Sequence, residues 1–119
     1  MRKSKINISG FKIGTAENRD GLTGVTVILA PDGGATAGVD VRGCAPGTRE
    51  TDLLDPRKTV QKIHAVVLSG GSAFGLEAAS GCVKYLAEQG VGFPIGNVCV
   101  PIVCSAVLFD LMIGDEKAY

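Results

Sequence analysis

The residues best suited to chemistry lie at positions 70–75: Gly70, Gly71, Ser72, Ala73, Phe74 and Gly75. An apolar run at 65–68 precedes them and apolar residues at helical spacing follow, which predicts a strand, a tight loop and a helix. Unpaired N–H groups and the positive end of a helix dipole favour an anion or a developing oxyanion at such a loop. We call residues 70–75 the glycine loop and take them as the candidate substrate pocket.

Known loop signatures do not fit this stretch. Ser72 stands where a dinucleotide-binding loop has its second glycine, and Phe74 where a nucleophile elbow has glycine. The Gly-Lys-Ser/Thr ending of a phosphate loop is also absent. We therefore favour Ser72 as a helix N-cap over Ser72 as a nucleophile. His64, the single histidine, could be a general base, but its place at a strand entrance favours a hydrogen-bonded structural role.

A second candidate site is the polar, glycine-punctuated segment 42–52. Arg42 and Arg49 could hold a carboxylate ligand, or they could pair with Glu50 and Asp52 to fix the shape of the loop. The structural alternative is favoured because polar loops usually satisfy their own hydrogen bonds first.

The cysteines give no metal-binding pattern. Cys44, Cys82, Cys99 and Cys104 form no C-x-x-C pair and have no histidine near them, so we expect reduced, mostly buried thiols, no metal and no cofactor. Cys104 and its neighbour Ser105 have no candidate base beside them, which favours core packing over catalysis for both.

The elements that must position the loop follow from periodicity. The helix after the loop has one apolar face, Leu76, Ala79, Val83 and Leu86, and Gly90 is its expected stop. The remaining expectations are an edge strand at 11–14, a polar loop at 17–21, a hairpin of 25–29 with 39–41 around a turn at 31–34, a short helix at 55–63 capped by Asp55, an irregular edge at 91–96 and a buried strand at 101–111.

Composition limits the class of protein. The 119 residues have 45% hydrophobic side chains and show no internal composition shift, which predicts a single region, and we expect its residues 1–10 to be flexible. Twelve basic residues balance twelve acidic ones without a basic stripe, so nucleic acid is not an expected partner. The apolar run 98–113 contains Pro101 and Asp110 and falls short of the roughly 20 residues of a membrane span. With no signal-peptide pattern, a cytoplasmic location is expected.

Four blocks in order resemble one family. They are A-G-V-D-V-R-G at 37–43, A-P-G-T-R-E-T-D-L-L at 45–54, L-S-G-G-S-A-F-G-L at 68–76 and V-L-F-D-L at 107–111. Together they are similar to the amino-terminal part of the DmpA-type aminopeptidases, which include L-aminopeptidase/D-esterases, β-peptidyl aminopeptidases and a nylon-oligomer hydrolase. The similarity covers nearly the whole chain from Phe11 onward.

The resemblance implies an α/β fold, an αββα sandwich that is here incomplete, in which a precursor cuts itself into two chains. The serine or threonine that starts the second chain is then the nucleophile, activated by its own amine and without a metal. Such enzymes remove amino-terminal residues from peptides, amides or esters, and a homo-oligomer is expected when the enzyme is complete. Some relatives place a tyrosine hydroxyl at the position of Phe74 as an oxyanion donor, and phenylalanine cannot supply it.

These implications lead to one main expectation and two alternatives. The main one is an amino-terminal fragment that is inactive alone, lacks a carboxy-terminal segment, and therefore exposes a large apolar patch prone to self-association. The alternatives are a small-anion or ligand-binding module that uses the glycine loop, and a non-catalytic subunit that completes a separate hydrolase chain.

Overall fold

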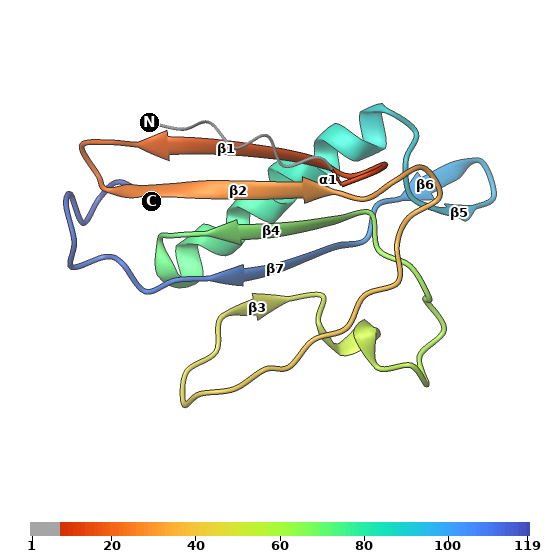
Figure 1. Cartoon of the computed structure of the whole chain (residues 1–119), viewed down its shortest axis with the longest axis horizontal. Helices are drawn as coiled ribbons and strands as arrows, with labels where there is room; N and C mark the ends of the chain where they lie inside the picture. The colour runs from red at the N-terminus through yellow and green to blue at the C-terminus, as the bar shows by residue number, and fades with distance from the viewer. Residues whose placement is uncertain (1–7) are drawn as a thin grey trace.

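The structure, a computed structural model, describes residues 8–119, so seven of the ten residues expected to be flexible lie outside the described part. Within that part it is mixed α/β, with one α-helix, a five-stranded sheet of order β1-β2-β4-β7-β3 and a two-stranded sheet of β5 and β6 (Figure 1). The elements are β1 (Lys12–Asn18), β2 (Thr23–Leu29), β3 (Thr48–Arg49), the 3-10 turn η1 (Asp52–Leu54), β4 (Ala65–Ser69), the 3-10 turn η2 (Ser72–Glu77), α1 (Ala78–Glu88), β5 (Phe93–Ile95), β6 (Val98–Val100) and β7 (Val103–Val107).

The outer hairpin pairs β1 with β2 in antiparallel register, with Ile13 opposite Ile28. Its turn is built by Asn18, whose side-chain oxygen accepts the N–H groups of Asp20 at 3.1 Å and Gly21 at 2.9 Å. Asparagine is well suited to this role because its short side chain can reach the backbone two residues on. The edge strand expected at 11–14 therefore exists, and it continues into the segment expected to be a loop.

The hairpin predicted between 25–29 and 39–41 is wrong. The turn itself forms, since the N–H of Gly34 donates to the carbonyl of Pro31 at 2.9 Å. After it, however, the chain makes a single antiparallel bridge from Ala35 to Ile63, and residues 38–42 are in no strand. β2 is already paired on both edges, by β1 and by β4. Alternating apolar residues identify a strand without saying which partner it takes, which explains the error.

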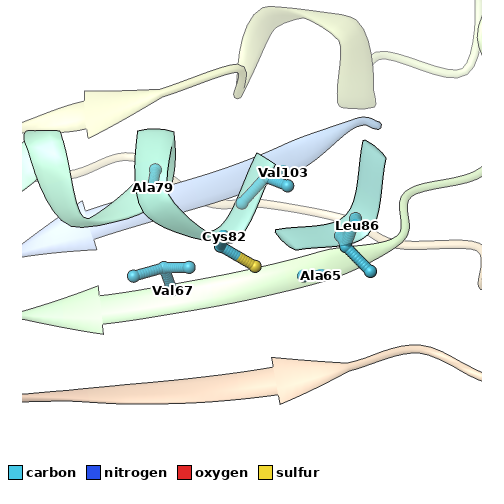
Figure 2. Close-up of a cluster of buried hydrophobic side chains, with 6 residues drawn as sticks. All are labelled: Ala65, Val67, Ala79, Cys82, Leu86 and Val103. Carbon is cyan, nitrogen blue, oxygen red and sulfur yellow. The ribbon is translucent and has the colours of Figure 1, made fainter. Parts of the chain in front are cut away.

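The strand, loop and helix predicted around the glycine loop are confirmed as β4, η2 and α1. β4 and β7 are parallel neighbours, and α1 connects them across one face of the sheet (Figure 1). The buried core lies between them, and Figure 2 shows the helix residues directed at the two strands. Its fully or nearly fully buried members are Ala65, Val67, Ala79, Cys82, Leu86 and Val103. Burying a side chain such as Leu86 contributes about 1.5–3 kcal/mol.

The predicted stop at Gly90 is also confirmed. Its φ is +68°, and its N–H donates to the carbonyl of Ala87 at 3.0 Å. The N–H of Val91 donates to the carbonyl of Leu86 at 2.9 Å. This pair of bonds is a Schellman motif, which satisfies the last helical carbonyls and favours glycine at the left-handed position.

The helix predicted at 55–63 is wrong. Only η1 forms nearby, and Asp55 follows that turn instead of capping a helix. The Asp55 carboxylate accepts the backbone N–H of Arg57 at 2.9 Å and binds the guanidinium of the same residue, so local side-chain bonds replace helical ones. The buried strand expected at 101–111 is present as β7 but ends at Val107, and the irregular edge at 91–96 contains β5.

The opposite face of the sheet carries a smaller core. Ile63, Ile102 and Cys104 are buried there, covered by partly buried side chains of the segment between β2 and β4. Towards β1 this face is open, with Ile13 and Leu68 exposed. No helix among residues 8–119 is long and apolar enough to cross a membrane.

Candidate functional site

The glycine loop leaves β4 at the edge of the sheet where β4 and β7 both end. Its first three amides donate hydrogen bonds inside the protein: Gly70 to the Gly24 carbonyl at 2.9 Å, Gly71 to the Asp110 carboxylate at 2.7 Å, and Ser72 to the Leu108 carbonyl at 2.9 Å. The expectation that these amides are free to bind an anion is therefore wrong for all three. A carboxylate of the protein itself already occupies the position of an anion at Gly71.

Ser72 is not the N-cap of the helix. It is the first residue of η2, has a φ of 53°, and no side-chain capping bond is made at the start of η2 or of α1. Residues 72–75 of the loop belong to the 3-10 turn η2, which leads directly into α1 at Ala78. A non-glycine residue at positive φ stores backbone strain and is held there by its surroundings. The structure therefore gives Ser72 a role in the backbone conformation of the loop and no capping role.

One side of the loop opens on a groove of about 710 Å³, which we call the loop-side groove. It lies over β1 and β2 beside the start of α1. Among its lining residues are Ala16, Val25, Gly70, Phe74, Gly75 and Tyr119. Three of the six glycine-loop residues therefore face the groove, while Gly71, Ser72 and Ala73 do not line it. Its walls are mainly apolar side chains, which suits an apolar portion of a ligand.

Phe74 and Tyr119 form the rim of the loop-side groove. Their rings stack with centroids 4.1 Å apart and planes inclined by 16°. The Phe74 side chain is more than half exposed, so this stack is an aromatic surface and not part of the core.

The two arginines of the second candidate site, Arg42 and Arg49, do not line the loop-side groove, and they bind different partners. Arg49 donates to the hydroxyl of Ser80 on α1 at 2.7 Å, and Arg42 forms an exposed ion pair with Asp40. Neither pairs with Glu50, whose φ is 57° and whose carbonyl accepts the Cys104 thiol at 3.1 Å. Arg49 thus fixes the loop through a serine on the helix, and the predicted pairing of the arginines with Glu50 and Asp52 is wrong.

The remaining candidates for nucleophile and base are locked into the core. His64 is buried, its Nδ1 accepts the N–H of Ile102 at 3.1 Å, and burial lowers its pKa. Burial and the charge of Glu50 raise the pKa of Cys104 to about 11. Ser105 is buried, and its hydroxyl has no hydrogen-bond partner among the described residues. These side chains have structural positions, in agreement with the sequence analysis.

Sequence reasoning missed Asp110, the residue that binds Gly71. Its carboxylate also accepts the hydroxyl of Thr23 at 2.8 Å. A signal was available, because Asp110 is an acid inside an apolar block just after a buried strand. Had β4 and β7 been recognised as parallel neighbours, the loops after both strands would have been expected at one edge.

The cysteines and acids are dispersed. Cys82 and Cys104 are buried, Cys44 is exposed, and all four thiols are free. No group of three or more His, Cys, Asp or Glu side chains in residues 8–119 is arranged to hold a metal ion.

Comparison with known proteins gives the family. Peptidase family S58 matches residues 5–118. An uncharacterized aminopeptidase of Mycobacterium leprae is 47% identical over 117 residues, which is 92% of this chain and 32% of the relative. A Mycobacterium tuberculosis protein described in the same words is 54% identical over 91 residues, or 76% of this chain and 26% of the relative.

A more distant relative has a more specific description. The 6-aminohexanoate-oligomer endohydrolase of Kocuria sp. is 33% identical over 115 residues, 97% of this chain and 30% of the relative. The chain thus spans about a third or less of the length of these relatives. Since the family match covers nearly all of its residues, the chain belongs to peptidase family S58, the DmpA family that its sequence resembles.

Proposed function

We propose that this chain is the amino-terminal portion of a self-processing aminopeptidase. The complete enzyme hydrolyses amino-terminal peptide, amide or ester bonds by acyl transfer, and its nucleophile is the serine or threonine that begins a carboxy-terminal segment. Within it, the glycine loop and the loop-side groove form one wall of the substrate cleft. The chain alone has no activity.

The observation that carries this proposal is the partial coverage of the family. The chain matches family S58 over residues 5–118 yet corresponds to only 26% to 32% of its mycobacterial relatives. Most of the polypeptide of those relatives therefore has no counterpart here, and a nucleophile that lies in that part would be absent. This difference in coverage supports the proposed inactivity of the chain alone.

The chemistry of the described residues supports the same proposal. A serine or cysteine nucleophile needs a base within hydrogen-bond reach, about 2.6–3.2 Å. His64 uses its Nδ1 to accept a backbone N–H, and the thiol of Cys104 is directed at a carbonyl. Ser105 makes no hydrogen bond to any described residue. None of them meets the requirement.

The exposed face beside α1 supports the proposed partner segment. Besides the loop-side groove, a second apolar groove of about 560 Å³ lies over β1 and β2, which we call the strand-side groove. Its lining residues include Gly14, Val25, Val27, Leu29, Cys82 and Tyr85. α1 packs mainly on β4 and β7, and the apolar residues of β2 on this face are only partly buried. An αββα sandwich needs a further helix here and a second sheet on the opposite face, and we assign both to the carboxy-terminal segment.

The experiment mixes the chain with the part of the Mycobacterium leprae relative that follows the matched region, processed so that it begins with its serine or threonine. Hydrolysis is followed with L-alanine p-nitroanilide, the β-alanine analogue and a 6-aminohexanoate dimer. The matched control is the same segment with its first residue changed to alanine.

We expect turnover of at least one substrate in the mixture and none with the chain alone or with the alanine control. Turnover by the chain alone would contradict the proposed absence of a nucleophile. A well-folded complex without turnover would instead favour a non-catalytic role for the chain.

A further inference from the structure

Asp110 ties together three segments at the edge where β4 and β7 end. One carboxylate oxygen accepts the N–H of Gly71, and the other accepts the hydroxyl of Thr23, the first residue of β2. Asp110 itself follows β7. Hydrogen bonds to a charged acceptor are roughly twice as strong as neutral ones, so this residue is a strong link between the loop and two strands.

Within residues 8–119, the carboxylate is bound by these two hydrogen-bond donors and forms no ion pair. The ion pairs among the described residues are Arg19 with Glu17, Arg42 with Asp40 and Arg57 with Asp55, none of which includes Asp110. In agreement, the hydrogen bonds from Gly71 and Thr23 lower the pKa of Asp110 below that of an ordinary aspartate. The carboxylate therefore fills, from within the protein, the place that an external anion would take at the loop.

The close packing around Asp110 leaves no room for a side chain at Gly70. A Cβ added at Gly70 would overlap both the Asp110 carboxylate and the Thr23 hydroxyl. The backbone of the loop consequently lies directly against this pair. A small movement of the carboxylate would move Gly70, which lines the loop-side groove.

We propose that Asp110 is the positioning residue of the glycine loop. Its carboxylate fixes Gly71 against the start of β2 and so sets where Gly70, Phe74 and Gly75 stand in the groove wall. The assignment of that wall to a substrate cleft rests on the proposed function above. The fixing of the loop can be tested without any enzymatic activity.

The test measures amide hydrogen exchange at Gly71 by NMR in the ¹⁵N-labelled chain. The variants are Asp110→Ala, which removes both acceptors, Asp110→Asn, which keeps an acceptor for Gly71, and Thr23→Val, which removes the second anchor. Asp115→Ala is the matched control, because this aspartate lies in the same tail and its carboxylate accepts the N–H of the nearby Lys117 at 3.0 Å. Val67 in β4 is the internal reference for global unfolding, since it is fully buried.

Asp110→Ala is expected to speed exchange at Gly71 relative to Val67 by about 10- to 100-fold, the range that loss of a charge-assisted bond implies. Asp110→Asn should recover much of the protection, Thr23→Val should lose part of it, and Asp115→Ala should leave it unchanged. Unchanged exchange at Gly71 in a folded Asp110→Ala chain would overturn the proposal. If that variant does not fold, wild-type protection of Gly71 in Thr23→Val would overturn it instead.

A second readout separates this proposal from the proposed function. In the active mixture described above, Asp110→Ala should lower kcat by at least about tenfold, with partial rescue by Asp110→Asn, because a misplaced wall disturbs the reacting geometry. Absence of turnover with the wild-type chain would count against the proposed function only. The exchange measurement would still decide whether Asp110 positions the loop.

Discussion

At the scale of single residues, two buried serines on neighbouring strands differ in one hydrogen bond. Ser69 ends β4, and its hydroxyl donates to the carbonyl of Gly75 at 2.8 Å, closing the glycine loop. The hydroxyl of Ser105 on β7 is buried without a partner among the described residues. A buried polar group costs free energy unless it is paired, so the two hydroxyls should have opposite effects on stability.

We predict that Ser105→Ala raises the free energy of unfolding by about 1 kcal/mol and that Ser69→Ala lowers it by about the same amount. Urea denaturation monitored by circular dichroism measures both. Each variant serves as the control for the other, because both delete one hydroxyl from a buried strand. A loss of stability in both would show that the Ser105 hydroxyl has a partner in solution.

The thiols should differ in reactivity by their burial. Because burial and the charge of Glu50 raise the pKa of Cys104 to about 11, this thiol is protonated, and therefore weakly reactive, at pH 8. Cys44 is exposed. We predict that iodoacetamide labels Cys44 in the folded chain and reaches Cys104 only after denaturation, as peptide mass spectrometry can measure. Equal labelling rates in the folded chain would contradict the buried position of Cys104.

The lowered pKa of Asp110 predicts a pH dependence of stability. A carboxyl group whose pKa is lower in the folded state stabilises the fold above its unfolded pKa, which is about 4, and loses that contribution as the pH falls through the folded value. We therefore expect wild type to exceed Asp110→Asn in urea midpoint at pH 7, with the difference shrinking towards pH 2. A difference that is constant over this range would argue against an ionised, hydrogen-bonded Asp110.

At the scale of elements, local sequence signals predicted the consecutive β4, glycine loop and α1 correctly. They did not predict which distant strands pair with one another. The apolar run at 65–68, the helical spacing and Gly90 each act within a few residues, so the sequence displays them directly. The partners of β2 and the position of Asp110 depend on contacts between distant segments. Thr23 and Asp110, for example, are separated by 87 positions. Without the strand order, no periodicity identifies such a pair.

The end of α1 offers a test of the backbone argument. Gly90 has a left-handed backbone and Gly81 lies inside the helix, and a Cβ at either would meet no atom within 4 Å. We predict that Gly90→Ala lowers stability by about 1 kcal/mol through backbone strain. Gly81→Ala should raise it by up to about 1 kcal/mol through helix propensity. Thermal unfolding of the two variants measures this contrast, and equal shifts would contradict the Schellman geometry.

At the scale of the whole molecule, the sheet is covered unevenly. α1 covers β4 and β7, whereas the loop-side and strand-side grooves lie beside it over β1 and β2, where Val25, Val27 and Leu29 are only partly buried. An apolar surface of this kind marks an interaction site or a risk of aggregation. The proposed carboxy-terminal segment would cover that surface and bring the nucleophile to the glycine loop.

Sedimentation velocity of the chain, with and without the carboxy-terminal segment of the Mycobacterium leprae relative, measures whether that segment covers the apolar surface. We predict that the average mass of the chain alone increases with concentration. An equimolar amount of the segment should replace that association by a one-to-one complex. A chain that stays monomeric at every concentration and does not bind the segment would contradict the account.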